Sequence, residues 1–114
     1  MGVYPPIVMR TYGIFGSHTT EGCPLFNREN RQLLLSMVEN FENKAHRYNV
    51  NIKEQYHSGL EHTFVWIAEA DNAHSIEDLM IETGVAKFNT LKIVPLRTLQ
   101  HVVESCKKLE SRTP

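Results

Sequence analysis

The chain has 114 residues, of which 41% are hydrophobic and 22% charged, and its formal net charge is −1. These ordinary values exclude a disordered chain, and the length predicts a single domain over residues 1–114. The sequence has scattered basic residues and no apolar run of about 20 residues, so we expect neither nucleic acid nor a membrane as a partner. Two cysteines are too few for a disulfide scaffold, and the N-terminus lacks a secretory signal pattern. Both features predict a cytoplasmic protein with reduced thiols.

Hydrophobic periodicity and turn residues predict four strands and three helices. In chain order we expect a strand over residues 7–15, a helix over 28–48, a strand over 50–57, a turn over 58–61, a strand over 62–70, a helix that Ser75 caps and that ends near Gly84, a strand over 90–96 and a helix over 98–108. The long helix has one apolar stripe, formed by Leu34, Met37, Val38, Phe41, Ala45 and Tyr48. Pro95 favours an edge position for the last strand, because proline cannot donate to a neighbouring strand.

This order is a split β-α-β-β-α-β arrangement followed by an extra C-terminal helix. It predicts the α+β class and a ferredoxin-like fold with an antiparallel sheet. In that topology the end of the first strand approaches the start of the third.

The strand expected over residues 62–70 is apolar at consecutive positions, Phe64-Val65-Trp66-Ile67-Ala68. A strand with one face in water should alternate, so we expect this strand to be covered on both sides. The two main helices cover one face only. The sequence therefore predicts a homodimer in which the open sheet face packs on a second copy. The alternative is a monomer whose C-terminal helix folds across that face.

Two short segments carry most of the reactive side chains, His18-Thr19-Thr20-Glu21-Gly22-Cys23-Pro24 and His57-Ser58-Gly59-Leu60-Glu61-His62. The predicted topology brings both to one rim of the sheet. We expect His57 and His62 to oppose each other across the hairpin, close enough to share an ion.

Imidazoles and a thiolate are the ligands that Zn(II) and copper prefer. The sequence predicts a zinc or copper site at this rim, with His18, Cys23 and His62 as ligands and His57 as a fourth. Three protein ligands would leave a position open for catalysis on a small molecule, whereas four would make a structural site. Glu21 or Glu61 is the candidate partner that orients an imidazole. The remaining histidines, His46, His74 and His101, are expected at the surface.

Two interpretations need no metal. Cys23 can be a nucleophile or redox thiol whose thiolate is favoured by a neighbouring histidine, although the sequence shows no third group of a triad. Alternatively, the domain is a ligand-binding module with an apolar pocket for a small molecule. The candidate lining residues are Tyr12, Phe15, Tyr56, Phe64 and Trp66.

The strand order, the His62-Thr63 start of the third strand and its Ala68-Glu69-Ala70-Asp71 exit resemble the dimeric α+β barrel superfamily. The likeness is to its small, uncharacterised GYD-type and muconolactone-isomerase-like members. The segment over residues 18–24 is similar to a His-Thr-x-Glu-x-Cys-Pro pattern in that group. The resemblance implies a face-to-face dimer of sheets with a small cavity between helices and sheet. It implies no particular reaction, because the superfamily hosts many activities.

Overall fold

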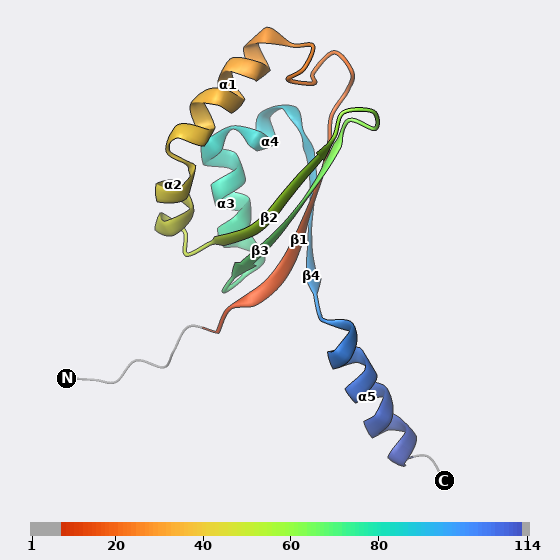
Figure 1. The fold of residues 1–114 in the computed structure, drawn as a ribbon. Coiled ribbons are helices and arrows are strands. Elements are labelled where there is room, and N and C mark those ends of the chain that lie inside the picture. The colour runs from red at the N-terminus through yellow and green to blue at the C-terminus, as the bar shows by residue number, and fades with distance from the viewer. Residues whose placement is uncertain (1–7, 113–114) are drawn as a thin grey trace, which may run out of the picture.

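The computed structural model describes residues 8–112, which form an α+β domain around one four-stranded antiparallel sheet (Figure 1). The elements are β1 (Arg10–Ser17), α1 (Arg28–Glu39), α2 (Phe41–Arg47), β2 (Asn51–Ser58), β3 (Thr63–Ala70), α3 (Ala73–Thr83), α4 (Val85–Phe88), β4 (Thr90–Leu96) and α5 (Leu99–Arg112). The strands lie in the order β2-β3-β1-β4, and every neighbouring pair is antiparallel. This arrangement is compatible with the expected ferredoxin-like fold.

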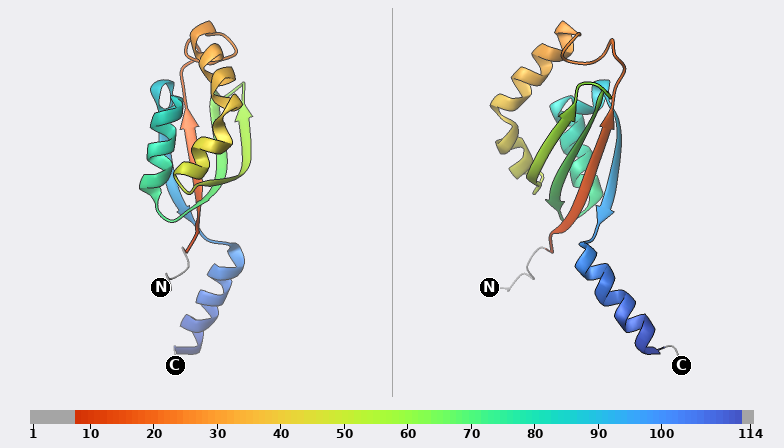
Figure 2. Two further views of the ribbon diagram at one scale, coloured as in Figure 1. Left: turned by 90° about the vertical axis from the view of Figure 1, so that its left-hand side faces the viewer. Right: turned by 45° about the vertical axis from the view of Figure 1, so that its right-hand side comes forward.

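The helices α1 to α4 lie on one face of the sheet, as the two views of Figure 2 show. The core between them is built by alternate residues of β3, because successive side chains of a strand point to opposite faces. Phe64, Trp66, Ala68 and Ala70 are buried on the helix side, whereas Val65 and Ile67 on the other side are partly exposed. The absence of a side chain at Gly16 on β1 makes room for the Phe64 ring, since a Cβ there would overlap it.

The helix expected over residues 28–48 is two helices, which is a correction to the prediction. Asn40 ends α1 and begins α2 with φ −132° and ψ 19°, outside the helical region. Its side-chain oxygen accepts a hydrogen bond from Asn43 Nδ2 at 2.8 Å. This bond between two side chains accompanies the break in the helix. Met37, Phe41 and Ala45 are buried on either side of the break, whereas Val38 is exposed.

Two other boundaries differ slightly from the expectation. Helix α3 begins after Asn72, whose side-chain oxygen accepts from the Ser75 N–H, so Asn72 and not Ser75 is the cap. The first strand runs from Arg10 to Ser17 and not over 7–15: residues 8 and 9 are not part of it, and the expected first residue, Ile7, lies outside the described residues. Strand β4 has the expected bounds and lies at a sheet edge, which agrees with the interpretation of Pro95.

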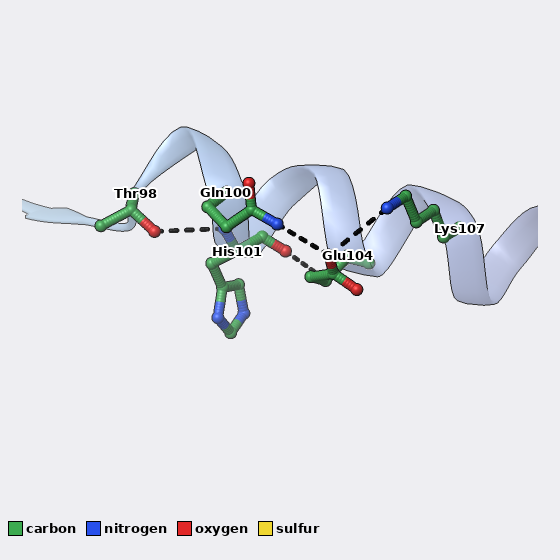
Figure 3. A network of polar contacts seen from close by, with 6 residues as sticks. Thr98, Gln100, His101, Glu104 and Lys107 are labelled. Carbon is green, nitrogen blue, oxygen red and sulfur yellow. Dashed lines mark hydrogen bonds and ion pairs between the residues drawn. The ribbon is translucent and has the colours of Figure 1, made fainter.

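Helix α5 projects away from the end of β4 and covers neither face of the sheet (Figures 1 and 2). None of its residues is buried. The monomer in which this helix folds across the open face is therefore not what the structure shows. The helix is held by its own side chains (Figure 3): Thr98 Oγ1 accepts from the His101 N–H at 3.1 Å, and Gln100 Nε2 donates to Glu104 Oε1 at 2.7 Å.

The sheet face opposite the helices carries a contiguous set of apolar side chains. Phe15 of β1 and Tyr56 of β2 both pair with Val65 of β3, so the three form a row across the sheet. Phe15 is 41% exposed and Tyr56 is 61% exposed. We call this row, together with Ile67 and Val94, the open-face patch. No described segment of the chain covers it.

Candidate metal centre

The two histidine-bearing segments meet at one end of the sheet, where β1 ends and β3 begins (Figure 1). Ser17 pairs with Thr63 in the last rung of the β1–β3 ladder. The next residue, His18, donates its backbone N–H to the carbonyl of His62 at 3.0 Å. The expected approach of these segments is confirmed, and it fixes the backbones of both histidines against each other.

The loop that follows His18 folds back and carries Cys23 to the same place. Its backbone is held by side chains on either side: Thr19 Oγ1 accepts from the Gly22 N–H at 3.0 Å, and Asn30 Nδ2 donates to the Gly22 carbonyl at 2.8 Å. The Cys23 carbonyl accepts from the N–H groups of Phe26 and Asn27 at 2.8 and 2.7 Å. Asn27 is also the N-cap of α1. The start of this helix therefore determines where the fully buried Cys23 side chain lies.

His18, Cys23 and His62 form a group whose ligand atoms all lie within 4.8 Å of one another. Zinc bonds of about 2.0 Å to nitrogen and 2.3 Å to sulfur would place tetrahedral ligand atoms roughly 3.5 Å apart. Even the most widely separated of these atoms would therefore have to approach by no more than about 1.3 Å to bind an ion. This group could hold a metal, and it consists of three of the four residues that the sequence singled out.

The His18 imidazole is oriented by Asn89, which immediately precedes β4. His18 Nδ1 lies 2.8 Å from Asn89 Oδ1, and Asn89 Nδ2 donates to the Val85 carbonyl at 2.9 Å. The second bond fixes the amide so that its oxygen faces the imidazole. Nδ1 of His18 must then carry the proton, which leaves a lone pair on Nε2. This Nε2 is buried and has no hydrogen-bond partner among the described residues.

His62 is held in a backbone conformation that few residues adopt. Its φ of 55° lies in the left-handed region, which costs free energy for a residue with a Cβ. Its ring meets the edge of Phe26 at a centroid distance of 6.2 Å. Nδ1 of His62, like Nε2 of His18, is buried without a hydrogen-bond partner in the described part of the chain. Two unsatisfied imidazole nitrogens therefore occur beside one buried thiol.

His57 lies next to this group but is not one of its three members. Its ring stacks on His18 with the centroids 5.4 Å apart and an interplanar angle of 5°. It pairs with Phe64 in the β2–β3 ladder, so the expected opposition to His62 is wrong. The turn begins one residue later than predicted, and His62 stays outside the strand. Burial, followed by repulsion from His18 and His62, lowers the pKa of His57 below its usual 6.5.

The expected second partners of the imidazoles were Glu21 and Glu61. Both residues are exposed, and neither carboxylate bonds to these histidines within residues 8–112. Asn89 takes that role instead. The sequence shows no motif for it, because His18 and Asn89 are 71 positions apart. The only available signal was topological: β4 pairs with β1, so the residue before Thr90 lies beside the residue after Ser17.

An apolar cavity of about 270 Å³ lies between the helices and the sheet beside this group. His18 and His57 form part of its wall, together with Leu34, Phe64, Trp66 and Phe88. Phe64 and Trp66 of the predicted aromatic lining are therefore present, and Tyr56 adjoins the cavity although it pairs with Val65 in the row on the opposite sheet face. Tyr12 belongs to the core instead, and Phe15 lies on the opposite sheet face.

The other histidines, His46, His74 and His101, are exposed, as expected. None of the helices within residues 8–112 is long and apolar enough to span a membrane. Comparison of the chain with known proteins found no matching family model, no matching curated protein and no matching solved structure. The function is therefore argued from the site itself.

Proposed function

We propose that this small cytoplasmic protein binds one transition-metal ion, zinc or copper, through His18 Nε2, Cys23 Sγ and His62. The observation that carries the proposal is the pair of buried imidazole nitrogens that find no partner among residues 8–112, on two histidines that cluster with a buried thiol. An unsatisfied buried polar group costs about 1–3 kcal/mol, and proteins seldom leave two side by side. A metal ion would satisfy both nitrogens at once.

The donor set favours a borderline or soft ion. One thiolate and two imidazoles suit Zn(II) and copper, whereas magnesium and calcium prefer oxygen ligands. The hydrogen bond from His18 to Asn89 is the kind of outer contact that ordinarily fixes the tautomer of a metal-bound histidine. With three protein ligands, a bound ion would keep a fourth position for water or a small molecule, which is the arrangement of catalytic sites.

The metal-free alternative is a reactive Cys23 activated by the neighbouring histidines. Its weakness is burial, because a catalytic thiol is ordinarily partly accessible and Cys23 is fully buried. The two functions make opposite predictions about a chelator. Removal of a bound ion should expose the thiolate and speed its reaction with a thiol reagent, whereas a metal-free nucleophile should react at the same rate with and without the chelator.

The decisive experiment is elemental analysis of untagged, gel-filtered protein, with a Cys23→Ser variant and Cys106→Ser as its matched control. Cys106 is the other cysteine and is exposed on α5. We expect near-stoichiometric zinc or copper in the wild type and in Cys106→Ser, and its loss in Cys23→Ser. Failure of the wild type to retain metal after incubation with Zn(II) and with Cu(I) would refute the proposal.

We also propose that the open-face patch packs on a second copy of the chain. Support comes from the exposed row of Phe15, Val65 and Tyr56, over which lies a hollow of about 510 Å³, and from the position of α5 away from this face. A contiguous apolar surface of this kind is typical of an interface. The resemblance to dimeric α+β barrels, which no comparison tests, stays a prediction.

Light scattering after gel filtration tests the dimer. We expect twice the 13.1 kDa chain mass for the wild type and a monomer for Val65→Lys. The control is Val102→Lys, which places the same charge on the exposed apolar side of α5 and should leave the dimer intact. A monomeric wild type at tens of micromolar, or dissociation by Val102→Lys alone, would contradict this arrangement.

A further inference from the structure

The cavity beside the candidate metal centre has a wall in common with it. His18 belongs to both, and the ring of His57 stacks on His18 from the side of the cavity. Phe88 also faces this region, with its ring centroid 6.2 Å from that of His18. A molecule bound in the cavity would therefore lie against the imidazole that we assign as a ligand.

The chemistry of the cavity changes from one end to the other. Phe64, Trp66 and Val85 are buried apolar side chains, and together with Leu34 and Phe88 they offer no charged group to a ligand. The polar side chains are the two imidazoles, Gln55 and Asn89. Both amide atoms of Asn89 are already used, whereas the ring nitrogens of His57 make no hydrogen bond within the described residues. A matching ligand is apolar over most of its surface and polar at one end.

The volume limits the ligand to a small molecule. Cavities that enclose drug-sized compounds measure about 300–1,000 Å³, and this one is just below that range at about 270 Å³. Aromatic walls favour a flat ring, which can pack against them face to edge. One or two rings fit these limits.

We propose that the cavity binds a small aromatic compound with one nitrogen or oxygen donor, and that this donor occupies the remaining coordination position of the ion at His18, Cys23 and His62. The proposal rests on the proposed metal function, because the ion supplies the coordination position that the donor would occupy. The proposal names the class of ligand that the metal centre would select. Such a ligand has a flat, uncharged ring, and it binds through its donor atom and its ring together.

The test uses 4-phenylimidazole as the probe, with imidazole and toluene as its two halves. Trp66 is the only tryptophan of the chain and lines the cavity, so its fluorescence reports occupancy directly. With the zinc-loaded protein we expect 4-phenylimidazole to bind at least about tenfold more tightly than imidazole, because the phenyl group is removed from water. Removal of zinc should weaken the binding of 4-phenylimidazole by at least about tenfold and leave that of toluene unchanged.

A cavity-filling variant separates the cavity from the metal centre. Leu34 lines the cavity from α1, whereas its neighbour Leu35 is exposed and does not. Leu34→Phe should retain zinc and imidazole binding but lose the advantage of the phenyl group, and Leu35→Phe should behave like the wild type. Equal affinities of zinc-loaded Leu34→Phe and wild type for 4-phenylimidazole would overturn the assignment of this cavity.

The outcomes also distinguish the two proposals. A wild type that binds no zinc contradicts the proposed function, and the ligand proposal then falls with it. A wild type that binds zinc but prefers 4-phenylimidazole over imidazole by less than about tenfold contradicts the ligand proposal alone. Binding of 4-phenylimidazole that is equally tight with and without zinc also contradicts it, because the donor would not then lie on the ion.

Discussion

His18 and Asn89 are 71 positions apart in the sequence, and their side chains lie 2.8 Å apart, Nδ1 to Oδ1. This contact occupies Nδ1 of the imidazole and leaves Nε2 as the nitrogen available to the cluster with Cys23 and His62. The amide is fixed in turn by its bond to the Val85 carbonyl at the start of α4. The short helix before β4 thus determines the tautomer of the histidine that directly follows β1.

Substitution of Asn89 should weaken metal binding without removing a ligand. We expect Asn89→Leu to lower zinc affinity about 10- to 100-fold, the usual cost of losing an outer partner of a metal-bound histidine. Asn89→Asp keeps an oxygen acceptor for His18 Nδ1 and should retain most of the affinity. Competition with a chromophoric chelator measures both. Equal losses in the two variants would mean that Asn89 acts only through the fold.

The affinity for the metal should decrease at low pH, because protons compete with the ion for the ligand atoms. Cysteine binds as a thiolate and histidine as a neutral imidazole, so binding releases protons and the affinity falls as the pH is lowered. Titration calorimetry in buffers of different ionisation enthalpy counts the released protons. The Cys106→Ser variant, which keeps all three proposed ligands, should release as many protons as the wild type. A binding enthalpy independent of the buffer would rule out a thiolate ligand.

His57 should make the metal-free protein less stable in acid. Its pKa in the folded protein is below 6.5, chiefly because burial disfavours the charged ring. The unfolded chain therefore binds the proton more readily, and the free energy of unfolding decreases as the pH falls through 6.5 toward the lower folded value. Urea unfolding at several pH values should show a weaker decrease for His57→Gln. An identical decrease in both proteins would assign the effect to other groups.

Truncation of Trp66 should destabilise the fold. Trp66 is only 7% exposed and packs against Phe41 and Phe64 at centroid distances of 5.6 and 4.9 Å. Trp66→Ala leaves a large cavity and should cost about 3–5 kcal/mol of unfolding free energy. Leu60→Ala in the β2–β3 turn, where the side chain is 93% exposed, should cost less than about 0.5 kcal/mol. Near-native stability of Trp66→Ala in urea would contradict its place in the core.

The spacing of apolar and turn residues predicts most helices and strands, because this spacing follows directly from the geometry of each element. Alternation and turn residues located all four strands, and β4 has the expected bounds. The sequence predicts one continuous helix over residues 28–48, because the spacing of apolar residues shows which positions are buried. That spacing does not show where the helix axis bends. The break at Asn40 coincides with a hydrogen bond between the Asn40 and Asn43 side chains, a weak signal in a strongly apolar stripe.

The sequence by itself determined the α+β class, the end of the sheet where the reactive residues collect, and three of the side chains that meet there. Each follows from short-range spacing and from the way antiparallel strands must pair. Only the tertiary structure decided that His57 stacks beside the cluster and that Asn89 orients His18. It also decided that two imidazole nitrogens find no partner in the described part of the chain, and that an apolar cavity adjoins the cluster. These features depend on side-chain directions and on contacts between distant segments, which packing fixes and periodicity does not.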